Sequence, residues 1–147
     1  MISQVIVLAA LIFPQPSPFP QSSADNPPGF LLWQGGVPPG GLSEKDAFGN
    51  HTLSISHRDK DGLAEVHDKF VDVMIIQSGE AKLVVGGTAM EPTATEPGET
   101  RGKSIQGGIT RELHPGDVIR VPAKTAHQFF IPSGGQITYV LIKIAAN

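Results

Sequence analysis

Three residues with side chains suited to metal binding or proton transfer stand at the front of an apolar, strand-like run. Glu65, His67 and Asp72 open the stretch LAEVHDKFVDVMIIQSGEAKLVVGG, which covers residues 63–87. In an extended strand, side chains alternate between two faces, so Glu65 and His67 point the same way and lie about 7 Å apart along the chain. Asp72 reaches the same point only if the chain turns after His67, and the residues HDKF offer such a break.

Imidazole and carboxylate groups together suit a divalent ion such as Fe(II), Mn(II), Ni(II) or Zn(II). On spacing alone, a cluster of surface ion pairs explains the same residues better than a metal site does. A second stretch, GDVIRVPAKTAHQFF over residues 116–130, adds a turn, a short strand, a proline bend and a histidine at the entry to another strand. His127 is therefore a further candidate metal ligand.

The two stretches together resemble the two motifs of the cupin superfamily, whose members are small jelly-roll β-barrels. The family motifs are G-x5-H-x-H-x3–4-E-x6-G and G-x5-P-x-G-x2-H-x3-N. The residues that match them at the family spacing are His67, Asp72, Gly79, Gly116, Pro122 and His127. The likeness covers residues 52 to 142 and implies an all-β fold of the double-stranded β-helix, or jelly-roll, type.

The sequence departs from the family pattern at the metal site itself. Glu65 stands where the first histidine of the family would be, and Asp72 stands where its glutamate would be. Three other motif positions also differ, at Asp59, Lys124 and Ile131. The resemblance thus implies a metal set of Glu65, His67, Asp72 and His127. The extra carboxylate favours Fe(II) or Mn(II), with Zn(II) or Ni(II) as alternatives, and the shorter Asp72 reaches the ion directly or through water.

Further residues are expected to line a pocket beside this site. They are His57, Met74, Arg120, Phe129, Ile131 and Tyr139. His57 shares an alternating face with Leu53 and Ile55, which places it either inside the barrel or as a hydrogen-bonded histidine of the core or rim. Ordinary packing explains Met74 and Tyr139 equally well.

No catalytic residue is identified from the sequence. If Glu65 or Asp72 detaches from the ion, it can serve as a general base. The alternative for the whole site is a vestigial pocket in which one of these carboxylates forms a salt bridge with Lys69 or Arg58.

The elements that must position these residues are short strands. The chain has 147 residues with 17 Gly and 13 Pro, which suits one turn-rich β domain rather than a helical bundle. Residues 42–48 are the only predicted helix, and residues 88–108 are predicted to be an extended polar loop that caps the barrel mouth. The predicted strands are residues 51–58, 69–79 and 80–87, three short strands in 109–132, and 136–144.

The N-terminal part is predicted to be separate from the barrel. Nine apolar residues, Val5 to Phe13, have the length of a signal-peptide core, and Ser22 and Ala24 suit a cleavage site before Asp25. A buried N-terminal strand is the alternative. We therefore expect a signal peptide over residues 1–24, an irregular arm over 25–41 and the cupin barrel over 42–147. The protein is then periplasmic or secreted, and otherwise cytoplasmic.

Composition excludes some functions. The chain has no cysteine, which excludes disulfides and zinc–thiolate sites. With a net charge of -3 and no cluster of basic residues, neither nucleic acid nor, after signal cleavage, a membrane is expected as a partner. The expected function is a metal-dependent enzyme, an oxygenase or an isomerase or lyase, acting on a small oxygenated molecule. The alternatives are a barrel that binds a sugar or organic acid without catalysis, with or without metal, and a purely structural site. The resemblance also implies a homodimer.

Overall fold

The computed structural model describes residues 27–36 and 45–146, and the chain divides into two units, residues 1–30 and 31–147. Of the first unit, only residues 27–30 are described, and they form a turn in which the Phe30 N–H donates to the Pro27 carbonyl. The predicted signal peptide, with its cleavage site at Ala24, lies outside the described residues. Within these residues, no helix has the length and apolar character needed to cross a membrane.

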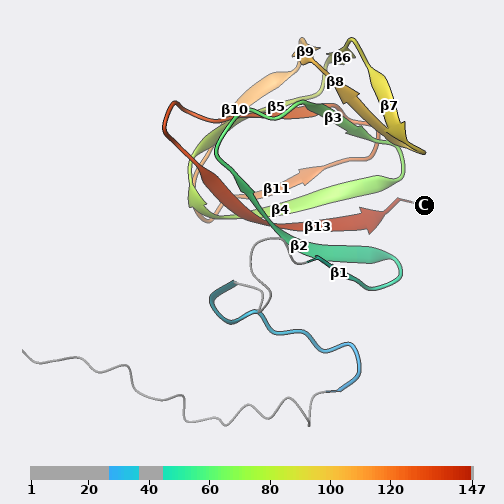
Figure 1. The fold of residues 1–147 in the computed structure, drawn as a ribbon, viewed down its shortest axis with the longest axis vertical. Helices are drawn as coiled ribbons and strands as arrows, with labels where there is room; N and C mark the ends of the chain where they lie inside the picture. Colours follow the sequence, from blue (N-terminus) through green and yellow to red (C-terminus); the bar gives the residue numbers. More distant parts are fainter. Residues whose placement is uncertain (1–26, 37–44, 147) are drawn as a thin grey trace, which may run out of the picture. The chain divides into compact units, whose positions relative to one another are not determined.

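The second unit is built from two antiparallel sheets, as the sequence predicts. The five-stranded sheet has the order β1-β2-β13-β4-β11, and the six-stranded sheet has the order β10-β5-β12-β3-β8-β7. Figure 1 shows the two sheets as facing layers, with β4 and β13 in one and β5 and β3 in the other. β6 and β9 form a separate two-stranded sheet. These crossing strand orders are those of a jelly roll.

The elements in chain order are a 3-10 turn η2 (Gln34–Gly36) and the strands β1 (Lys45–Ala47), β2 (His51–Arg58), β3 (Ala64–His67), β4 (Phe70–Gly79), β5 (Ala81–Val85), β6 (Thr88–Met90), β7 (Thr93–Glu96), β8 (Glu99–Gly102), β9 (Ser104–Gln106), β10 (Ile109–Leu113), β11 (Val118–Val121), β12 (His127–Phe130) and β13 (Ile137–Ala145).

The inner faces of the central strands change from polar to apolar along their length. On β4 the inward residues are Asp72, Met74 and Ile76, and all three are buried. β12 places His127 before Phe129 in the same way. The apolar ends form the core, in which Phe129 stacks on Tyr139 of β13 with ring centroids 5.1 Å apart. The barrel interior is therefore a packed core at one end and a cluster of ionisable groups at the other.

Gly79 is needed where β4 turns toward β5. Its φ is 78°, which favours glycine, and a Cβ atom here would overlap the backbone carbonyl oxygen of Gln136. Gly116 also has a positive φ, 93°, but a Cβ atom there would meet nothing within 4 Å. Both glycines belong to the motif positions found in the sequence. Only the first is required by packing as well as by conformation.

Two predicted elements differ in the structure. The helix over residues 42–48 is wrong in its described part, because Lys45–Ala47 is strand β1, paired antiparallel with β2. A helix this short has little stability of its own, and pairing with a sheet edge satisfies the same backbone groups. The loop over residues 88–108 is also wrong, because it contains β6 to β9. Of these strands, β8 pairs with β3 and extends the six-stranded sheet.

Candidate metal centre

Strand register brings the ionisable residues of five strands to one point. Directly opposed residues of an antiparallel pair have side chains on the same face of the sheet. Glu65 of β3 is opposed by His127 of β12 on one side and by Arg101 of β8 on the other. His67 is opposed by Glu99 of β8. In the other sheet, Asp72 of β4 is opposed by Lys143 of β13.

Glu65, His67 and His127 form a group that could hold a metal ion. One ligand atom from each of the three lies within 4.8 Å of the other two. The imidazole rings of His67 and His127 have centroids 5.2 Å apart, and each residue is less than 5% exposed. The fourth residue of the predicted set, Asp72, places Oδ2 3.2 Å from Nε2 of His67 and 3.5 Å from Nε2 of His127.

Hydrogen bonds orient both imidazoles for metal binding through Nε2. Nδ1 of His127 lies 3.3 Å from the carbonyl oxygen of Thr125, which only accepts, so the proton is on Nδ1 and the Nε2 lone pair is free. Nδ1 of His67 lies 2.6 Å from Oε2 of Glu99. A carboxylate that accepts the Nδ1 proton of a metal-binding histidine is a common outer partner in metal sites. The two rings therefore turn the same atom toward Asp72.

Asp72 has one oxygen with no partner. Its Oδ1 is buried and accepts no hydrogen bond from any described residue. Burial alone would raise the pKa of Asp72, but the hydrogen bond and charge of His67 outweigh it, so the pKa lies below its usual value. A buried carboxylate that stays ionised and keeps a free oxygen suits a cation or an ordered water. The donor set thus fits a divalent ion.

Three cations surround the same carboxylates. Arg58 contacts Glu65 at 3.0 Å, and Arg101 contacts both Glu65 and Glu99 at about 3.5 Å. Lys143 lies 3.6 Å from Glu99. Burial would raise the pKa of Glu65, but the charges of Arg101 and Arg58 outweigh it, and the pKa is lowered. The Arg58–Glu65 pair is the salt bridge that the sequence offered as an alternative to metal binding.

Solved structures of cupin proteins are similar to this chain. A cupin protein from Bacteroides fragilis has 17% identity and a TM-score of 0.48, over 68% of this chain and 70% of that one. A cupin-2 domain protein from Rhodospirillum rubrum has 15% identity and a TM-score of 0.49, over 69% and 56%. A DMSP lyase from Ruegeria pomeroyi has 13% identity and a TM-score of 0.46, over 65% and 38%. No protein-family model and no curated protein matches the sequence.

The jelly-roll strand order and the meeting of both motifs at one end of the barrel decide the architecture. The chain has the cupin fold. At these identities the likeness concerns the fold alone, and the chain spans less than two thirds of the second and third of these proteins. Activity must therefore be argued from the residues of this cupin barrel itself.

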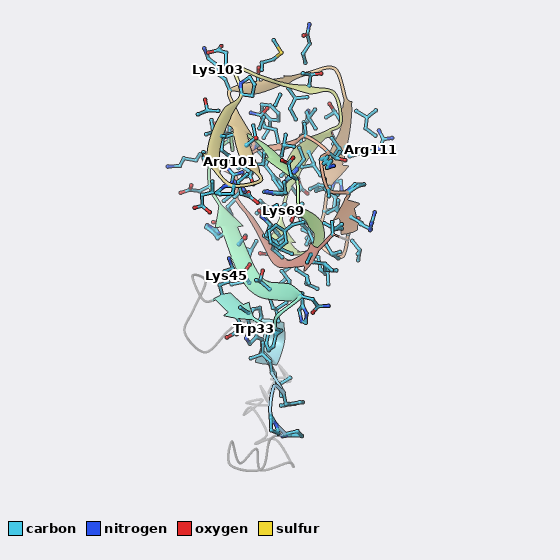
Figure 2. All side chains as sticks on the ribbon, turned by 90° about the vertical axis from the view of Figure 1, so that its right-hand side faces the viewer. Trp33, Lys45, Lys69, Arg101, Lys103 and Arg111 are labelled. Carbon is cyan, nitrogen blue, oxygen red and sulfur yellow. The ribbon has the colours of Figure 1, made fainter. Side chains whose placement is uncertain are left out.

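A cavity of about 300 Å³ opens beside the charged residues that surround His67. It is lined by Lys45, Thr52, Phe70, Thr95, Glu96, Pro97, Glu99, Arg101 and Lys143. Arg101 and Lys45 are labelled in Figure 2, on the side of the molecule that faces the viewer. Three of the lining residues, Glu99, Arg101 and Lys143, also belong to the cluster around His67. The cavity therefore adjoins the charged residues around His67, and none of the four candidate ligands lines it.

Four of the six residues predicted to line the pocket belong to the core or pack against it, and two are exposed. Met74, Phe129 and Tyr139 lie in the cupin core, and Ile131 packs against it. Tyr139 is linked to the site, because its hydroxyl accepts a hydrogen bond from Nε of Arg58 at 3.0 Å.

Arg120 and His57 lie outside the group. Arg120 is exposed and opposed by Val73, the residue that alternates with the inward positions of β4. His57 is exposed and contacts Thr138. The inward face of β2 carries Arg58, which contacts Tyr139 and Glu65, so Leu53, Ile55 and His57 lie on the other face. Of the two positions expected for His57, the structure therefore has the hydrogen-bonded histidine outside the pocket and not the one inside the barrel.

Glu99, Arg101 and Lys143 are site residues that the sequence interpretation missed. Glu99 and Arg101 alternate within ETRG, but the surrounding polar stretch has no apolar periodicity that marks a strand. Lys143 did carry a signal. It is the only charged residue in the apolar strand QITYVLIKI, and a charge inside such a strand indicates a buried partner or a ligand.

Proposed function

We propose that this cupin barrel binds a divalent metal ion and uses it to act on a small oxygenated organic molecule. The observation that carries the proposal is the convergence of Glu65, His67 and His127, with both imidazoles offering Nε2. Asp72 completes the set, directly or through water. Three or four protein ligands leave positions on an octahedral ion for a substrate.

Fe(II) or Mn(II) suits this set better than copper, because two of the four donors are carboxylates. Zn(II) and Ni(II) are the alternatives. When bound, such an ion polarises an oxygen of a substrate or activates dioxygen, which is the chemistry of an oxygenase or of an isomerase or lyase. The part played by the chain is to hold the ion, to exclude water through the core behind it, and to offer Glu65 or Asp72 as a general base.

The alternative is a barrel that binds a small molecule without catalysis. Its support is the pairing of Glu65 with Arg58 and Arg101, which already satisfies this carboxylate without an ion. Export from the cytoplasm and a homodimer stay predictions from the sequence.

The test is the metal content of anaerobically purified protein, measured by elemental mass spectrometry. We expect stoichiometric Fe or Mn in the parent protein and its loss in His67→Ala and His127→Ala. His57→Ala is the matched control, since this histidine is exposed and lies outside the group, and it should keep the ion. Circular dichroism verifies that each variant is folded. A parent protein without stoichiometric metal, even after reconstitution with Fe(II) or Mn(II), would favour the metal-free binding barrel.

A further inference from the structure

The charges of the cluster balance without a metal ion. Its carboxylates are Glu65, Asp72 and Glu99, and its permanent cations are Arg58, Arg101 and Lys143. With neutral imidazoles the three negative and three positive charges cancel. A bound divalent ion therefore leaves a partly buried cluster with two uncompensated positive charges. An excess of buried charge is costly unless a counter-ion accompanies it.

Lys143 is the cation that metal binding leaves without a good partner. Its Nζ lies 3.3 Å from Nδ1 and 3.4 Å from Nε2 of His67. When Nε2 binds an ion and Nδ1–H donates to Glu99, neither nitrogen can accept a hydrogen bond from an ammonium group. Among the described residues, the only acceptor that then remains is Oε1 of Glu99, at 3.6 Å. At least one of its three N–H donors is available to a ligand.

The adjoining cavity has the size and walls for an organic molecule. Lys143 and Arg101, which belong to the charged cluster around His67, line it, and Phe70 supplies an apolar wall. Nζ of Lys143 also lies 5.5 Å from the centroid of the Phe70 ring. The cavity volume of about 300 Å³ is at the low end of the range for small-molecule pockets. It is larger than the volume that an inorganic anion occupies.

We infer that the ligand of this site is a small organic carboxylate, whose anionic group lies between the metal ion and Lys143 and whose apolar part lies against Phe70. This inference rests on the proposed function and specifies its substrate class. Metal and carboxylate then bind cooperatively, because each supplies charge that the other needs. The coupling is reciprocal, so the carboxylate lowers the Kd of the metal by the factor by which the metal lowers the Kd of the carboxylate.

The experiment measures the Kd of Mn(II) by electron paramagnetic resonance of the free ion. The full chain is titrated alone, with benzoate, and with benzamide as an uncharged molecule of the same shape. Benzoate is expected to lower the Kd of Mn(II) about tenfold, within the usual range of coupling between sites, and benzamide to leave it unchanged. Equal effects of the two compounds, or none from benzoate, would overturn the inference.

Substitutions locate the coupling at Lys143. Lys143→Met is expected to bind Mn(II) alone more tightly than the parent, because a repelling cation is removed, and to lose most of the benzoate effect. Lys143→Arg should keep the effect. Lys82→Met is the control, since Lys82 is 58% exposed and pairs with Glu112 on the surface. Full benzoate coupling in Lys143→Met would overturn the assigned position of the carboxylate.

The outcomes also separate this inference from the proposed function. Mn(II) binding that ignores benzoate would contradict the carboxylate alone and leave the metal site standing. No Mn(II) binding under any condition would contradict both. The comparison of benzoate with benzamide in the parent protein does not depend on whether any variant folds.

Discussion

Glu65 lies directly opposite His127 in the antiparallel register of β3 and β12. These two residues come from the two separate motifs of the sequence, and a single strand pairing places their side chains on the same face. A shift of this register by one residue would turn one of them to the opposite face. The metal group is therefore a property of strand pairing, and substitutions within it can change its chemistry without moving the backbone.

The first prediction concerns the carboxylate of this pair. Glu65→Gln keeps the size of the side chain but replaces a charged ligand by a neutral one, and it leaves Arg58 and Arg101 without their contact to an anion. We expect the Kd of Mn(II) to rise at least as much as on loss of an outer partner, which is about 10- to 100-fold. Glu112→Gln, at an exposed position of β10 where the carboxylate pairs with Lys82 on the surface, should change it little. An unchanged Kd in Glu65→Gln would remove Glu65 from the ligand set.

The second prediction concerns the proton of His67 in the metal-free protein. Burial alone would lower the pKa of His67, but the hydrogen bond and charge of Asp72 outweigh it and raise the pKa above 6.5. The stabilisation from His67 is then fully present below pH 6.5 and is lost as the pH rises through the raised pKa. For Asp72 the sign is opposite, since its contribution is present above pH 3.8 and is lost as the pH falls through the lowered pKa.

NMR titration of the imidazole resonances in metal-free protein checks this. Asp72→Asn should lower the pKa of His67, because the uncharged amide no longer favours the protonated ring. Asp68→Asn, at an exposed position in the turn between β3 and β4, is the matched control and should have little effect. If the pKa of His67 in both variants equals that in the parent protein, the contact between Nε2 of His67 and Asp72 is not made in solution.

The third prediction assigns Glu99 a positioning role. Its Oε2 lies 2.6 Å from Nδ1 of His67 and fixes the tautomer that presents Nε2 to an ion. Removal of such a partner usually weakens metal binding about 10- to 100-fold. We expect this loss in Glu99→Ala and a partial recovery in Glu99→Gln, whose amide oxygen still accepts a hydrogen bond.

The matching readout for Glu99 is the nitrogen NMR spectrum of His67, which reports the tautomer directly. In Glu99→Ala the population with the proton on Nδ1 should fall. Unchanged metal binding together with an unchanged tautomer would show that Glu99 is not needed to orient His67.

The sequence predicts the fold and part of the site because both depend on local spacing. The alternation in β2 and β4 and the glycine turns mark the strands, and the motif spacings find His67 and His127. Alternation defines two faces of a strand, however, and not which of them is inside. In β2 the more polar face, which carries Arg58, points inward because it faces ionisable groups rather than the apolar core.

The residues that sequence spacing does not find are joined to the site by long-range pairing. Glu99 enters through the pairing of β8 with β3, and Lys143 through the pairing of β13 with β4. Their strands could not be placed beside the motifs without the register. β8 also lacks an apolar face, because its inward side chains contact charged groups. The polar inward face of β8 prevents its detection by a hydrophobic pattern, and the same polar face makes β8 part of the site.

The last prediction compares the two motif glycines, Gly79 and Gly116. Both have φ angles in the left-handed region, so alanine at either position carries a conformational cost of about 1–2 kcal/mol. At Gly79 the new Cβ would also overlap the carbonyl oxygen of Gln136, whereas at Gly116 it meets nothing within 4 Å. Chemical denaturation should show that Gly79→Ala lowers the free energy of unfolding clearly more than Gly116→Ala does. Equal losses would mean that the backbone of Gln136 moves aside, and the first motif would then require glycine only for its conformation.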